Sequence, residues 1–86
     1  MDINELIAIV KKKLNSQIKI EEIKIEDKTL LHKNNQGKQK EKFHIKISLK
    51  SVELKEMSKI ESTKVIYKIL DKEIKQFIHS IQILIN

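Results

Sequence analysis

Three histidines, His32, His44 and His79, carry imidazoles that could bind a metal ion or exchange a proton near neutral pH. The chain has no cysteine, so disulfides, thiolate metal sites and thiol nucleophiles are excluded. Any metal would have to be bound by histidine, aspartate or glutamate. His79 raises the sharpest question, because the closing segment "KQFIHSIQILIN" has the pattern of a buried strand. An imidazole buried without a hydrogen bond or a metal costs free energy, so His79 needs a partner.

Polar and apolar patterning predicts the elements that position these histidines. The expected elements are a helix at 3–15, strands at 21–28 and 42–50, a short helical turn at 54–57, a helix at 59–74 and a final strand at 77–85. Capping boxes of Asp2 with Glu5 and of Ser58 with Glu61 mark the starts of the two long helices. The polar segment from His32 to Glu41 contains the only glycine and is expected to be a loop.

This α-β-β-α-β order predicts one α+β domain over residues 1–86, with helices packed on one face of a three-stranded mixed sheet. The first two strands are joined by a loop and should be antiparallel. The third strand returns through a helix and should run parallel to the second. Parallel strands start at the same edge of a sheet, so His79 is expected to lie close to the loop that contains His32.

The position of each histidine in its predicted strand or loop determines which roles it could have. Strict alternation puts His79 on the apolar face with Ile81 and Ile83, where a structural hydrogen bond and a ligand role are both open. His32 is either an exposed loop residue or a second ligand. Two imidazoles would form half of a metal site, which a partner would have to complete. His44 falls on the polar face and is expected to be exposed, without a role.

Charge and composition narrow the function classes. The net charge is +6 and all 18 basic residues are lysine. Such a charge favours anionic partners, but arginine, which reads guanine, is absent and aromatic residues make up only 3%. Gly37 is the only glycine, so the sequence has no glycine-rich phosphate-binding loop. No serine lies in a G-x-S-x-G motif. An enzyme is therefore not expected.

Hydropathy bears on the expected compartment. No apolar run approaches the roughly 20 residues that a membrane span needs. The N-terminus is acidic and lacks the basic region of a secretory signal. The cytoplasm is therefore the expected location.

Four segments carry a match to a known family: "EDKTLLH", "KFHIKISLKSVEL", "KVIYKIL" and "FIHSIQI". In order and spacing they resemble the BolA-like family over nearly the whole chain. The resemblance implies a KH-like fold and a non-enzymatic role as partner of a monothiol glutaredoxin. In that heterodimer the two chains would jointly bind a bridging 2Fe–2S cluster. The expected role of the complex is iron–sulfur cluster trafficking or iron and redox regulation. By position, the resemblance implies His79 as the closing-strand ligand and His32 as the loop ligand, with glutaredoxin cysteine and glutathione completing the site.

Two alternatives stay open beside this expectation. The first is a KH-like nucleic-acid-binding transcriptional regulator with weak DNA affinity, although no G-x-x-G loop is present. The second is a protein-interaction domain that uses no cofactor. No membrane and no small-molecule substrate is expected as a partner in either case.

Overall fold

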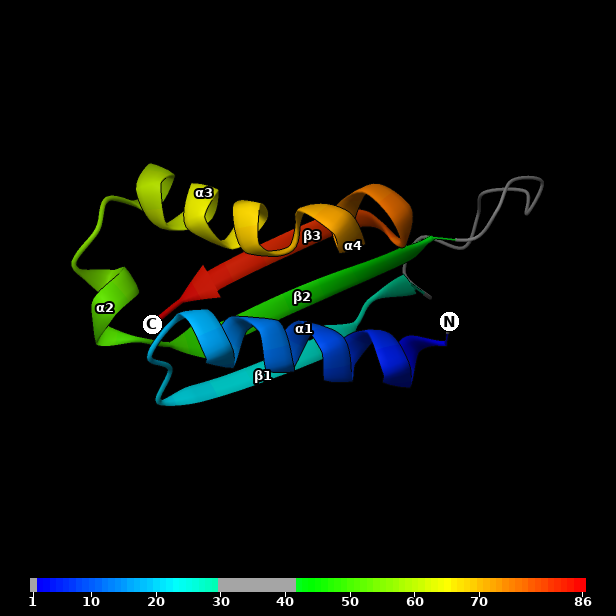
Figure 1. The fold of residues 1–86 in the computed structure, drawn as a ribbon, viewed down its shortest axis with the longest axis horizontal. Helices are drawn as coiled ribbons and strands as arrows, with labels where there is room; N and C mark the ends of the chain where they lie inside the picture. Colours follow the sequence, from blue (N-terminus) through cyan, green and yellow to red (C-terminus); the bar gives the residue numbers. More distant parts are fainter. Residues whose placement is uncertain (1, 30–41) are drawn as a thin grey trace.

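A computed structural model describes residues 2–29 and 42–86. Its helices are α1 (Ile3–Gln17), α2 (Val52–Lys55), α3 (Lys59–Ile69) and α4 (Asp71–Gln76), and its strands are β1 (Glu22–Asp27), β2 (Phe43–Lys50) and β3 (Ile78–Ile85). Figure 1 shows α1 and the α3–α4 pair lying side by side over one face of the sheet. The predicted α+β fold is confirmed.

The sheet has the order β1-β2-β3. β1 pairs with β2 in the antiparallel sense, and β2 pairs with β3 in the parallel sense, as expected. The end of β1 and the starts of β2 and β3 therefore meet at one end of the domain, at the right of Figure 1. β1 and β3 are both edge strands.

The core lies between the helices and the sheet. Apolar side chains from α1, β2, α2, α3 and the start of β3 form it, and the buried hydrophobic residues are Leu6, Val10, Leu14, Ile18, Ile45, Ile47, Leu49, Leu54, Ile66, Leu70 and Ile78. The alternation of β2 explains its share, since Ile45, Ile47 and Leu49 point to the helices. The opposite face of the sheet carries no helix among the described elements.

Local signals set the helix starts. Asp2 with Glu5 and Ser58 with Glu61 both form complete capping boxes, which confirms the predicted starts of α1 and α3. The expected helix at 59–74 is instead two helices. The reason lies at Leu70, whose backbone leaves the helical region (φ −99°, ψ 18°) while its side chain stays buried in the core.

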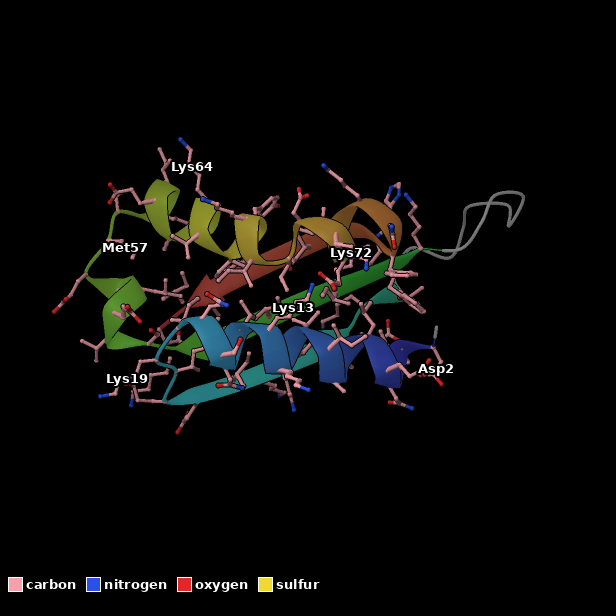
Figure 2. The ribbon with its side chains drawn as sticks, viewed as in Figure 1. Asp2, Lys13, Lys19, Met57, Lys64 and Lys72 are labelled. Atoms are coloured by element: carbon pink, nitrogen blue, oxygen red, sulfur yellow. The ribbon has the colours of Figure 1, made fainter. Side chains whose placement is uncertain are left out.

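An ion pair joins the two helical segments above the sheet. Lys13 Nζ of α1 lies 2.7 Å from Glu73 Oε2 of α4, and Glu73 is buried. Figure 2 shows Lys13 reaching from α1 toward α4. Lys13 therefore has a structural role, because it pairs with a buried carboxylate. The pair holds α4, whose C-terminal end leads into β3.

Candidate metal-ligand site

A β-bulge opens the last strand at the residue of interest. Phe43 pairs with Ile78 and His44 pairs with Ser80, which leaves His79 without a partner in the β2–β3 register. The backbone N–H of Phe43 also donates to the Phe77 carbonyl at 2.9 Å, so the strand starts are joined just before the bulge. An inserted residue of this kind re-aims side chains relative to strict alternation.

The bulge places His79 beside His44. Their ring centroids lie 4.9 Å apart, with the ring planes tilted by 54°. His79 is exposed, whereas Ile78 is buried and Ile81 is half-buried. The expectation that His79 shares the apolar face with Ile81 is therefore wrong, because the bulge interrupts the alternation on which it rested.

His44 also differs from its prediction. It is half-buried rather than exposed, and its Nδ1 lies 2.7 Å from Ser80 Oγ across the parallel pair. The ring therefore contacts two residues of β3, His79 and Ser80, and both contacts fix its place at the strand start. The sequence signal for this contact is that His44 and His79 each stand second in strands that start at the same edge.

The end of β1 is tied to the same place. The backbone N–H of His44 donates to Thr29 Oγ1 at 3.2 Å, and the His44 carbonyl accepts from the Lys28 N–H at 2.7 Å. The Thr29 hydroxyl in turn donates to Asp27 Oδ1. Thr29 therefore lies beside the backbone of His44 at the start of β2. His32, the expected loop ligand, lies outside the described residues.

Charged groups around the strand starts are mostly engaged. Lys28 Nζ lies 2.9 Å from Glu26 Oε1, and the hydrogen bond from Lys28 holds the pKa of Glu26 below its ordinary value. Lys42 Nζ donates to the Lys75 carbonyl at 3.3 Å, near the C-terminal end of α4, where a cation is favourable. At this rim of strand starts, the Lys28 and Lys42 ammonium groups are thus both engaged, one by a carboxylate and one by a backbone carbonyl.

The imidazoles of His44 and His79 are the side chains at these strand starts that could bind a metal ion. In residues 2–29 and 42–86, no group of three or more histidine, aspartate and glutamate side chains is arranged to hold an ion. Neutral imidazole nitrogen suits iron, zinc, copper and nickel, and a partner could supply the remaining ligands. A groove of about 210 Å³, lined by residues such as Met57 and Leu84, involves the other end of β3 and neither His44 nor His79.

Comparison with known proteins identifies the family. The sequence matches the family described as BolA-like protein over residues 14–86, so the chain belongs to the BolA family. No curated protein sequence matches it. Solved structures share the fold, among them the following three. The BolA domain of SufE1 from Arabidopsis thaliana has 21% identity and a TM-score of 0.77, with 100% of this chain and 93% of that chain covered.

The other two structures are more distant in sequence but cover most of the chain. BolA1 from Arabidopsis thaliana has 20% identity and a TM-score of 0.76, covering 92% of this chain and 87% of its own. A Bol-like protein from Babesia bovis has 14% identity and a TM-score of 0.70, covering 91% and 79%. These similarities show the fold.

Within the part of the chain that the structure describes, no helix is both long and apolar enough to cross a membrane.

Proposed function

We propose that this BolA-family protein is a non-enzymatic partner of a monothiol glutaredoxin and that the two chains jointly bind a bridging 2Fe–2S cluster. His79 is the ligand from the closing strand. His32 is the ligand expected from the loop, and glutaredoxin cysteine with glutathione completes the set. When bound, the cluster supplies one-electron redox chemistry or is itself the cargo that is passed on.

The observation that carries the proposal is that His79 is exposed near the start of β3, an edge strand of the sheet. A ligand shared between two chains must reach beyond its own surface, and His79 is exposed while the residue before it is buried. A structural histidine would instead be expected to lie among core side chains. Imidazole ligation at one iron is also established chemistry for a 2Fe–2S cluster.

The incomplete ligand set supports a shared centre. Among the described residues, no group of three or more histidine, aspartate and glutamate side chains is arranged to hold an ion, so His79 would need ligands from outside this part of the chain. With no cysteine in the sequence, the thiolates of an iron–sulfur cluster must come from elsewhere. A monothiol glutaredoxin with glutathione would provide two thiolates, which is the number of ligands that His79 and His32 would leave to be filled.

The test is anaerobic reconstitution of the cluster on a mixture of this protein and a monothiol glutaredoxin. We expect a heterodimer on size-exclusion chromatography whose visible absorption and circular dichroism differ from those of the glutaredoxin alone. His79→Ala should abolish that difference. Gln82→Ala, an exposed position on the same strand, is the matched control and should leave the spectrum unchanged. An unchanged spectrum in His79→Ala would rule His79 out as a ligand.

Nucleic-acid binding is the second candidate, favoured by exposed lysines. Lys64, Lys68 and Lys72 are exposed on α3 and α4. These exposed lysines could contact phosphates, but without arginine the surface is poorly equipped to read bases. This candidate predicts affinity that falls steeply with salt concentration. Absence of binding to duplex DNA at low salt would eliminate it.

A further inference from the structure

The groove beside the end of β3 is not used by the proposed function. Its apolar lining comes from α2, the turn after α2 and the last residues of β3: Leu54, Met57, Ile83, Leu84 and Ile85. With a rise of about 3.3 Å per residue, Leu84 lies about 16 Å along β3 from His79. The groove is therefore separate from the candidate metal-ligand site.

The groove lies at the free edge of β3. Ile83 and Ile85 pack against the core on the helix side, whereas Leu84 is 47% exposed and points to the opposite side. Side chains from both faces of one strand line the same groove where that groove runs along the edge of the strand. The other edge of β3 is occupied by β2. The groove therefore follows the edge that no described strand covers.

Backbone groups at this edge can accept an added strand. The Asn86 N–H donates to the Leu49 carbonyl of β2 at 2.8 Å. Backbone N–H and C=O groups of successive strand residues point alternately to the two sides of the strand, so those of Ile83 and Ile85 point away from β2. In the part of the chain that the structure describes, no strand pairs with them. Such an edge is a template for an extended segment of another chain.

Charge at the groove indicates which kind of segment would pair there. Lys55 and Lys59 also line the groove, and no acidic residue among those described does. Both lysines are exposed, and neither forms an ion pair with another described residue. The apolar lining suits apolar side chains, and the two ammonium groups suit carboxylates.

We propose that the groove and the edge of β3 bind an extended acidic segment of a partner protein, which adds to the sheet as a strand next to β3. The backbone of the segment pairs with Ile83 and Ile85, its apolar side chains enter the groove, and its carboxylates face the two lysines. This interaction does not depend on the proposed iron–sulfur function.

Two other occupants fit the groove less well. A second copy of this chain would bring its own net charge of +6 and its own Lys55 and Lys59 to the contact. A nucleic acid would find neither arginine nor an aromatic ring among the described residues that line the groove, so its bases would have nothing to stack on.

The first test is an NMR titration of the ¹⁵N-labelled chain at low ionic strength. The probe is a blocked synthetic peptide of three valines alternating with serines, with two aspartates at each end; a second peptide has lysines in place of the aspartates. We expect saturable shifts of the Ile83, Leu84 and Ile85 amides with the aspartate peptide, and at least tenfold weaker binding of the lysine peptide. Equal affinity for the two peptides, or no saturable shift of these amides, would overturn the proposal.

A charge exchange on the protein tests the two lysines. Lys55→Glu/Lys59→Glu should weaken binding of the aspartate peptide about tenfold and strengthen binding of the lysine peptide. Lys11→Glu/Lys12→Glu makes the same change of net charge at exposed positions of α1 and is the matched control, which should keep the wild-type preference. Equal effects of the two double variants would show that only net charge matters and would contradict the proposed site.

Strand addition is tested on the peptide, so that the fold of the protein is left intact. N-methylation of every second residue blocks the hydrogen bonds of one edge of the peptide, and N-methylation of the alternate residues blocks the other edge. One methylated peptide should bind within about twofold of the parent and the other at least tenfold more weakly. Equal affinities would exclude strand addition. Tighter binding of an oligothymidylate at the same amides would make the groove a nucleic-acid site and overturn the proposal.

Discussion

Lys13 Nζ and Glu73 Oε2 lie 2.7 Å apart, and they connect α1 to the helix that leads into the candidate site. Glu73 is 4% exposed, and its second oxygen, Oε1, has no hydrogen-bond partner among the described residues. A buried carboxylate with one unsatisfied oxygen depends strongly on the cation that pairs with it, here Lys13. The ion pair is therefore a point where removal of one partner should be costly.

Removal of Lys13 should destabilise the protein. In Lys13→Met the Glu73 carboxylate would stay buried without compensation, so we expect a loss of about 1–3 kcal/mol in the free energy of unfolding. The double variant Lys13→Met/Glu73→Met should recover much of that loss, because two apolar side chains need no desolvated charge. Urea denaturation measures both. Lys12→Met, at an exposed neighbouring position, is the control; an equal loss there would contradict the account.

Ser51 should contribute to stability well beyond its size. It is fully buried at the N-cap of α2, where its hydroxyl donates to the Lys19 carbonyl and accepts from the Leu54 N–H. Ser51→Ala breaks both bonds, so we expect a loss of about 1–2 kcal/mol by thermal or urea unfolding. Ser16→Ala removes an exposed hydroxyl and should cost far less. Equal effects of the two changes would show that the cap is unimportant.

The Glu26–Lys28 pair predicts a pH dependence of definite sign. The hydrogen bond from Lys28 lowers the Glu26 pKa below its ordinary value of 4.5. The resulting stabilisation is present above that ordinary value and is lost as the pH falls through the folded-state pKa. NMR titration should find the lowered pKa, and Lys28→Met should raise it. A Glu26 pKa that does not move in Lys28→Met would exclude Lys28 as the cause.

Thr29 should protect the backbone at the candidate site. Its hydroxyl accepts the His44 N–H at 3.2 Å. In Thr29→Val that N–H loses its acceptor, so we expect hydrogen exchange of the His44 amide to accelerate at least about tenfold. The Ile47 amide, deeper in β2, serves as the internal control and should exchange at an unchanged rate. Unchanged exchange at His44 would mean that Thr29 does not hold this strand start.

Much of the fold follows from periodicity and capping. The alternation of Phe43–Lys50 and the capping boxes at Asp2 and Ser58 are local signals, and each predicts its element closely. The pairing of β2 with β3 follows from the helical connection between them. The break at Leu70 could not be predicted, because no glycine or proline marks it and Leu70 continues the apolar stripe of the helix.

The candidate site was only partly predictable. Topology places His79 at the end of the sheet where β2 begins, and the structure bears out that placement. The bulge at His79 has no signature in the sequence, since no glycine marks it, and alternation therefore assigned His79 and His44 to opposite faces. The family match over residues 14–86 shows the class of protein but does not decide which imidazole accompanies His79.

The most direct test of the central claim is detection of a nitrogen ligand from this chain on the iron. The protein would be labelled with ¹⁵N-histidine, assembled with unlabelled glutaredoxin and glutathione, and the reduced cluster studied by pulsed electron paramagnetic resonance. We predict a strong ¹⁵N hyperfine coupling of a directly bound imidazole in the wild type, and loss of the His79 contribution in His79→Ala. A mixed complex whose reduced cluster shows no strongly coupled ¹⁵N would contradict the account.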